Sequence, residues 1–437
     1  MVAVLSDVQA LREPALQALL ACDRELVSIG KRIRVLKAID WPVELEERFL
    51  AGWRRGVPEL PAPPTRPVVA TEIPALASLM RRIDRGHPIG NWLYKTAWSY
   101  LVAARMLAGI GTPEFTRCST LLYGRPDFRY RSQDLTNFDA ATEMLAITDE
   151  MIDDRLVPPV PCDIPAGTFA EMLRERIGPI FRHDDIKVVL DPKLSSKATA
   201  SSKRIALRST ALFSERDLDQ LLQHEAFIHT LTSLNGRHQP HLQVLGLGAP
   251  RTTRTQEGLA TFAEIITGSI DISRLRRLAL RVVMVKRALD GADFIEVFRG
   301  FLDAGQSEIE SYRSAARVFR GGDVRGGICF TKDGAYLEGV MIIHVFIRKV
   351  LQEGRGELLP MLFAGRVTTA DVIMLAPYLE TGLVAPPVYL PPWARDPSRV
   401  LSIMAFSVAV QSLRLDRFDL QRFVDFEDEV IAECGIC

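Results

Sequence analysis

The sequence predicts a predominantly helical α+β protein with a small sheet. Apolar residues recur at spacings of three and four over residues 5–55, 73–109 and 137–155, which is the periodicity of helices that pack on a core. Two short segments instead carry the β-branched or alternating pattern of strands, IKVVLD at 186–191 and KRIALR at 203–208. The SSKATASS stretch between the two strands is expected to be a loop.

Proline-rich stretches divide the chain into segments. VPELPAPPTRPV at 57–68 predicts a linker after an N-terminal helical segment, residues 1–56. PPVPCDIPAG at 158–167 predicts the next boundary, between a helical region at 69–160 and a domain at 161–437 that ends in helices. A chain of 437 residues is long enough for two or three domains.

The composition excludes several broad classes. The chain has 54 Lys and Arg residues against 54 Asp and Glu residues, whereas a dedicated nucleic-acid binder usually carries a basic excess. The start, MVAVLSDVQALREP, lacks the basic and apolar regions of a signal peptide, and apolar runs such as VMIIHVFI are too short to span a bilayer. We therefore expect a cytoplasmic protein with neither nucleic acid nor membrane as a partner.

The second strand leads into a helix with clear ends. Ser214 and Asp217 have the spacing of a capping box, in which each side chain accepts a hydrogen bond from the backbone at the other position. The helical pattern then runs through SERDLDQLLQHEAFIHTLTSL, and Asn235-Gly236 is a typical stop signal. A helix that follows a strand pair is the setting in which zinc peptidases place their metal ligands.

This helix contains HEAFIH, in which His224 is followed by Glu225 and, five positions after His224, by His229. The zinc-peptidase signature H-E-x-x-H has its histidines four apart, so that both lie on one face. Five steps of about 100° leave two side chains roughly 140° apart on an ideal helix. A single-turn π-bulge absorbs one residue. If both histidines bind one metal, the helix is expected to be widened between them.

A third ligand is available downstream. Zinc sites in hydrolases use three protein ligands and leave a fourth position open. TRTQEGLATFAEIITG at 253–268 predicts a helix with Glu257 in its first turn and Glu264 seven residues later on the same side. One of these carboxylates would bind the metal, and the other would hold a metal-binding side chain in its orientation. The alternative is a solvated acidic face, which the surrounding apolar residues disfavour.

HEAFIH followed by QEGLA resembles the bacterial QEGLA-motif proteins named for flavohemoglobin expression, which are related to the eukaryotic microtubule-associated tyrosine carboxypeptidases. The likeness covers about residues 75–380. It implies a zincin-like metallopeptidase core with additional helices. It also implies one zinc ion per chain, held by His224, His229 and Glu257, with Glu225 as general base. Further similar segments are GHPIGNWLYKTAWSYLVAARML, GTPEFTRCSTLLYGRPD, LNGRHQPHLQVLGLGAPRTTRTQEGLA and ICFTKDGAYLEG.

Other side chains are candidates for contact with a substrate. Tyr336 could donate to the developing oxyanion, with Lys332 beside it, although a buried core tyrosine is the alternative. Arginine binds a carboxylate through two parallel hydrogen bonds, so a free C-terminus would suit one or two arginines. The candidates are Arg317, Arg320 and Arg325, which lie among glycines, and Arg254, which precedes QEGLA; Asn235 could line the site or serve a turn.

The leading interpretation is a zinc metallopeptidase, a carboxypeptidase that acts on a peptide or protein C-terminus. An aminopeptidase or endopeptidase with the same metal site is the second interpretation. A non-catalytic regulatory protein with a relic metal site is the third. His238 and His241, in NGRHQPHL, are alternative metal ligands.

Overall fold

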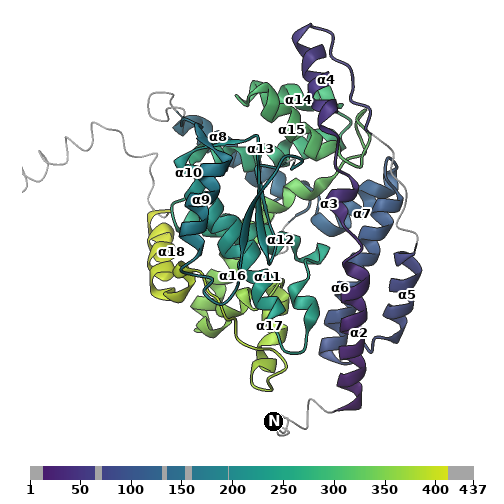
Figure 1. Ribbon diagram of the computed structural model, residues 1–437, viewed down its shortest axis with the longest axis vertical. Helices are drawn as coiled ribbons and strands as arrows, with labels where there is room; N and C mark the ends of the chain where they lie inside the picture. Colours follow the sequence, from purple (N-terminus) through teal and green to yellow (C-terminus); the bar gives the residue numbers. More distant parts are fainter. Residues whose placement is uncertain (1–12, 64–70, 130–134, 153–159, 195, 412–437) are drawn as a thin grey trace, which may run out of the picture.

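The computed structural model describes residues 13–63, 71–129, 135–152, 160–194 and 196–411. It is predominantly helical with two small sheets, which confirms the predicted α+β class (Figure 1). Residues 5–12 of the first predicted helical segment and 64–68 of the predicted linker lie outside the described residues. The division into segments stays a prediction.

The α-helices in the described residues are, in chain order, α2 (Pro14–Gly30), α3 (Val35–Ala38), α4 (Val43–Arg54), α5 (Glu72–Arg82), α6 (Pro88–Ala108), α7 (Pro113–Tyr123), α8 (Asn137–Met151), α9 (Ala166–Ile177), α10 (Glu215–Leu221), α11 (Leu231–Arg237), α12 (Thr253–Ile266), α13 (Ile272–Leu289), α14 (Phe294–Asp303), α15 (Glu308–Phe319), α16 (Ala335–Gln352), α17 (Thr369–Leu375) and α18 (Pro397–Gln411). A π-helix, η1 (Leu222–Thr230), joins α10 to α11. Short 3-10 turns are η2 (Gln243–Gly246), η3 (Pro250–Thr252), η4 (Thr331–Gly334), η5 (Gly356–Leu358), η6 (Pro360–Phe363), η7 (Ala376–Leu379) and η8 (Pro392–Arg395).

The strands form a three-stranded and a two-stranded sheet. The first has the order β2-β4-β3 and the second pairs β1 with β5. The predicted strands are confirmed as β2 (Lys187–Asp191) and β4 (Arg204–Arg208), which run parallel with Val188 opposite Ile205. The expected loop between them contains a further strand, β3 (Ala198–Ala200), antiparallel to β4. The remaining strands are β1 (Ile164–Pro165) and β5 (Leu212–Phe213).

Helices surround the three-stranded sheet at the centre of the molecule. The N-terminal helices α2, α5 and α6 stand together on one side, at the right of Figure 1, and α9 lies on the other. The π-helix contacts β3, β4 and α9, so the HEAFIH segment is held against the sheet. A second, smaller core lies between α4, α14 and α15 at the top of Figure 1, where Phe49, Phe294 and Phe298 pack edge to face. In the part of the chain that the structure describes, no helix has the length and apolar content needed to cross a bilayer.

Asp23 ties the N-terminal helices to the segment that follows the HEAFIH helix. This side chain of α2 is fully buried, and its carboxylate accepts backbone hydrogen bonds from Gln243 at 2.8 Å and Val244 at 3.1 Å. Burial raises the pKa of Asp23 from 3.8 to about 6, although both hydrogen bonds oppose this shift. The folded protein therefore favours the protonated carboxyl more than the unfolded chain does.

This raised pKa gives a pH dependence with a defined sign. Between pH 3.8 and about 6 the folded state binds more protons at Asp23 than the unfolded state, so the stabilisation is complete below pH 3.8 and is lost as the pH rises through 6. A shift of about 2 units corresponds to about 3 kcal/mol. We expect the free energy of unfolding of wild type, relative to Asp23→Asn, to fall by about that amount from pH 4 to pH 7. A difference that does not change with pH in urea denaturation would contradict this.

Candidate functional site

The helix that carries HEAFIH is widened where its histidines lie, as predicted from their spacing. Ser214 and Asp217 form the expected capping box at the start of α10, and the chain passes through the π-helix Leu222–Thr230 before α11. The i to i+5 bonding of a π-helix absorbs one residue, so positions five apart return to one face. The rings of His224 and His229 accordingly have centroids 4.9 Å apart.

Helix α12 brings Glu257 to the two histidines. The predicted helix at 253–268 is confirmed as Thr253–Ile266, and α12 packs directly against the π-helix. Glu257 Oε2 lies 3.6 Å from His224 Nε2 and 3.5 Å from His229 Nε2. One ligand atom from each residue lies within 4.8 Å of the other two. The three side chains therefore form a compact, largely buried group, called here the His-His-Glu group.

Glu264 contacts His224 through the ring nitrogen that does not face Glu257. Its Oε1 lies 2.6 Å from His224 Nδ1, and Arg274 of α13 donates to both oxygens of the same carboxylate. Burial is the largest single effect and would raise the pKa of Glu264, but the charge of Arg274 and the contacts with His224 and Arg274 together outweigh it and lower the pKa to about 2. An ionised Glu264 that accepts from Nδ1 leaves Nε2 of His224 directed at Glu257. This is the arrangement in which a carboxylate orients a metal-binding imidazole.

The charges of the His-His-Glu group favour a cation. Burial would lower the pKa of His224, but the adjacent carboxylates of Glu257 and Glu264, together with the charge of Glu225, raise it to about 10. Among the described residues, Glu257 Oε2 has no hydrogen-bond partner. Two imidazole nitrogens and one carboxylate oxygen are a typical ligand set for catalytic zinc. The residues present therefore fit a zinc ion.

Lys332 binds the other oxygen of Glu257. Its Nζ donates to Oε1 at 2.6 Å from the short turn η4, which precedes α16. Glu257 therefore has one oxygen fixed by Lys332 and one directed at the histidines. The same ammonium group lies 5.0 Å from the centre of the Tyr336 ring, so Lys332 connects the His-His-Glu group to Tyr336.

The family model of microtubule-associated tyrosine carboxypeptidases matches residues 47–412, which include every residue described above in this subsection. The chain belongs to this family. Membership implies a hydrolase of the carboxypeptidase type with a peptide or protein as substrate. It also agrees with the resemblance seen in the HEAFIH and QEGLA motifs. No curated protein matches the chain.

In this member of the carboxypeptidase family, the other residues predicted from the sequence do not all lie at one site. Arg317 donates to both carboxylate oxygens of Asp333, at 2.6 and 2.7 Å, and Arg317 Nη2 lies 3.5 Å from the Tyr336 hydroxyl. Arg320 lies over the Phe330 ring, with its Cζ 5.4 Å from the centroid. Arg317 and Lys332 therefore come together at Tyr336, and of the three only Lys332 is shown in contact with Glu257.

Three predicted residues have partners outside this cluster. Arg325 is exposed and pairs with Asp323. Arg254 pairs with the buried Glu338 at 3.2 Å. Asn235 is buried, and its amide bonds to the main chain of two other segments, at Phe363 and Tyr389. None of the three reaches the His-His-Glu group through a hydrogen bond or ion pair among the described residues.

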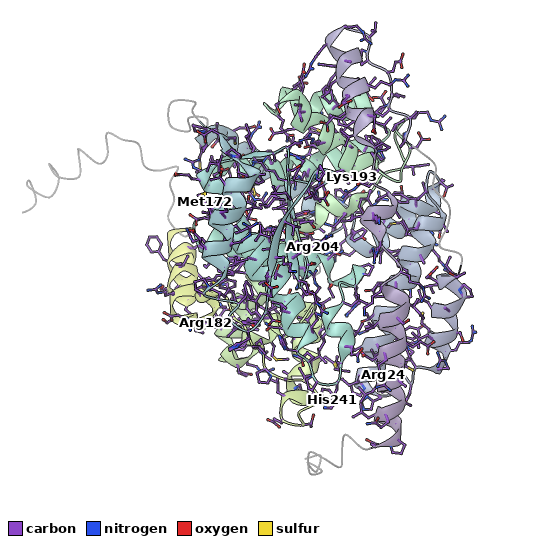
Figure 2. All side chains as sticks on the ribbon, in the orientation of Figure 1. Arg24, Met172, Arg182, Lys193, Arg204 and His241 are labelled. Atoms are coloured by element: carbon purple, nitrogen blue, oxygen red, sulfur yellow. The ribbon has the colours of Figure 1, made fainter. Side chains whose placement is uncertain are left out.

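The alternative ligands His238 and His241 lie apart from the metal-binding candidates. His238 Nε2 lies 2.9 Å from Asp184, whose carboxylate also accepts from Tyr389. Figure 2 shows His241 toward the lower edge of the molecule, below the sheet strand marked by Arg204. Within the described ranges, the one cluster of side chains suited to a metal is His224, His229 and Glu257.

Several residues of the site carry no signal in the sequence. Arg281 projects from α13, a helix rich in basic residues, but its side chain is only 18% exposed and lies 3.9 Å from Asp333. Arg366, which follows η6, donates to the carbonyl of His229 at 3.1 Å. These contacts join segments far apart in the chain, and no local pattern marks them.

Glu225 remains accessible within the widened turn. It is half-buried next to His224, and its carboxylate makes no hydrogen bond to any other described residue. The charge of Glu225 also acts on Arg366. Burial is the larger effect and lowers the pKa of Arg366, whereas the nearby charges of Glu257 and Glu225 oppose this. Glu225 is thus a carboxylate at the edge of the His-His-Glu group that no described side chain or backbone group occupies.

Proposed function

We propose that this protein is a zinc-dependent carboxypeptidase that removes the C-terminal residue of a peptide or protein. The observation that carries the proposal is the widened helix, which turns His224 and His229 toward Glu257 and leaves Glu225 free beside them. A structural zinc site needs no free carboxylate of this kind, so the arrangement favours catalysis over a relic site. A zincin-like core, in which the metal helix lies against a small sheet, belongs to the same proposal.

Each residue has a distinct task in the proposed reaction. His224, His229 and Glu257 would hold one zinc ion, which when bound supplies an acidified water and polarises the scissile carbonyl. Glu225 takes the proton of the attacking water and passes it to the leaving amine. The Tyr336 hydroxyl donates to the developing oxyanion. Glu264 keeps His224 oriented, and Lys332 keeps Glu257 in place.

The test combines metal content with release of a C-terminal residue. Protein purified without a histidine tag is expected to contain about one zinc per chain. It should release tyrosine from a peptide that ends in a free C-terminal tyrosine. A chelator should abolish the release, and added zinc should restore it. Cleavage at internal bonds only would favour an endopeptidase. Absence of metal after incubation with zinc would overturn the proposal.

A further inference from the structure

An arginine far along the chain bonds to the end of the widened helix. Arg366 follows η6, and its Nη2 donates to the carbonyl oxygen of His229 at 3.1 Å. His229 is the second histidine of the His-His-Glu group and the last but one residue of the π-helix Leu222–Thr230. Arg366 therefore contacts the main chain of a residue whose imidazole belongs to the candidate metal site.

This contact lies where the wide turn passes into an α-helix. A π-helix bonds each N–H to the carbonyl five residues back and an α-helix to the carbonyl four residues back, so the pattern changes between them. Leu231, the first residue of α11, still donates to a carbonyl five residues back. Thr232 Oγ1 donates to the carbonyl of Ile228 at 2.7 Å. The next carbonyl, that of His229, accepts from Arg366. Two consecutive carbonyls at the junction thus accept from side chains.

The segment that carries Arg366 is itself fixed against α11 and the turn after it. The N–H of Arg366 donates to the carbonyl of Leu245 at 2.8 Å. The side-chain amides of Asn235 and Gln239 donate to two carbonyls within the three residues before Arg366, at 2.7 and 2.9 Å. A Cβ at Gly365 would lie 2.8 Å from the Leu245 carbonyl oxygen, so this close approach needs glycine. The Arg366 side chain therefore starts from a defined backbone position.

The half-buried guanidinium of Arg366 has no counter-ion beside it. Within the described ranges it makes no ion pair, and its one hydrogen bond is to the His229 carbonyl. Burial lowers the pKa of Arg366, and the charge of Glu257 is the first effect that opposes this shift. The guanidinium also packs beside Gly248, whose carbonyl accepts from the Tyr100 hydroxyl at 3.1 Å. The bond to His229 is thus the directional contact of this side chain.

Building on the proposed function, we propose that Arg366 is a positioning residue that holds His229 in place for the metal by fixing the end of the π-helix. Without this donor the turn can relax toward α-helical bonding, in which His224 and His229 would point about 140° apart. The charge of Arg366 acts in the opposite direction, because a cation that interacts with Glu257 also repels a divalent metal ion. Position and charge therefore predict changes of opposite sign in metal affinity.

Arg366→Met removes the donor and the charge but keeps most of the side-chain volume, so that packing is disturbed little. We expect it to weaken zinc binding by about 10- to 100-fold in competition with a chelator, the usual effect of removing a residue that orients a metal ligand. Arg366→Lys keeps a donor and should recover part of this loss. The visible spectrum of cobalt-substituted protein, which reports coordination geometry, should change in Arg366→Met.

Arg174→Met is the matched control. Arg174 also donates to a main-chain carbonyl, that of Val188 at 2.9 Å, but this carbonyl belongs to β2. The control should match wild type in zinc affinity and cobalt spectrum even if its thermal stability falls, and thermal unfolding verifies that each variant is folded. Equal or tighter zinc binding by folded Arg366→Met, with an unchanged cobalt spectrum, would overturn the positioning role and leave the proposed carboxypeptidase intact.

Hydrogen exchange in metal-free protein separates this inference from the proposed function. Backbone amides of residues 229–236 should exchange faster in Arg366→Met than in wild type or Arg174→Met, because the end of the π-helix opens more readily. Faster exchange at these residues would support the positioning role even if wild type bound no zinc and cleaved no peptide, which would overturn the proposed function alone. Exchange equal to that of wild type would count against Arg366 as the residue that fixes the turn.

Discussion

Glu225→Gln is expected to lower kcat by about 10²- to 10⁴-fold while zinc content stays near one per chain. Glutamine has nearly the same size as glutamate but cannot accept a proton. Glu225 is not among the three residues whose atoms converge within 4.8 Å, so its replacement leaves the ligand set intact. Binding of a free-acid peptide should change little, because the loss falls on the proton-transfer step.

Steady-state kinetics and elemental analysis on the same preparation test this expectation. Glu215→Gln is a suitable control, because Glu215 lies at the exposed start of α10, within the same run of helix. Unchanged turnover in Glu225→Gln would remove the general base from the mechanism. Loss of zinc together with turnover would instead mean that Glu225 helps to hold the metal.

Gly258→Ala is expected to cost about 3 kcal/mol of folding stability, the upper end of the usual overpacking cost, and to weaken zinc binding. Gly258 follows Glu257 where α12 crosses α16, and a Cβ there would lie 2.2 Å from the carbonyl carbon and 2.3 Å from the carbonyl oxygen of Gly339. Backbone atoms cannot move aside as a flexible side chain can, so the helices must separate. Separation would shift Glu257 away from the histidines.

Urea denaturation and competition for zinc with a chelator measure the two effects. Gly167→Ala is the matched control, because Gly167 lies in the exposed part of α9 with no atom within 4 Å of the added methyl group. Alanine is a better helix former than glycine, so this control should be neutral or stabilising by up to about 1 kcal/mol. A Gly258→Ala protein as stable as the control would mean that the two helices tolerate a wider spacing.

The sequence was most informative where the spacing of residues within one short segment determines the local structure. The five-residue spacing of His224 and His229 predicts a widened helix, because an α-helix would turn them apart, and the structure has a π-helix there. The Ser214–Asp217 pair predicts a helix start in the same way. The helix containing Glu257 and Glu264 was also predicted from its local pattern.

Features that depend on distant segments were missed or placed differently. The α11 helix runs to Arg237, so Gly236 does not end it; a Cβ at Gly236 would lie 2.1 Å from the Leu245 carbonyl, and glycine is needed for this close approach. Arg281 faces inward because α13 packs beside η4 and α15, which a basic amphipathic pattern cannot reveal. Arg254 bonds Glu338 because α12 and α16 cross at two glycines.

The π-helix has a consequence for how relatives of this chain are recognised and compared. Deleting one residue between His224 and His229 would produce the letters of the common zinc-peptidase signature. The chain after the deletion would then rotate by about 100° relative to the first histidine. Thr232, which bonds Gln256, and Asn235, which anchors two distant segments, would lose their partners. The two motifs are thus equivalent in space but not in alignment, and a comparison that closes the gap by matching letters would misplace every residue after it.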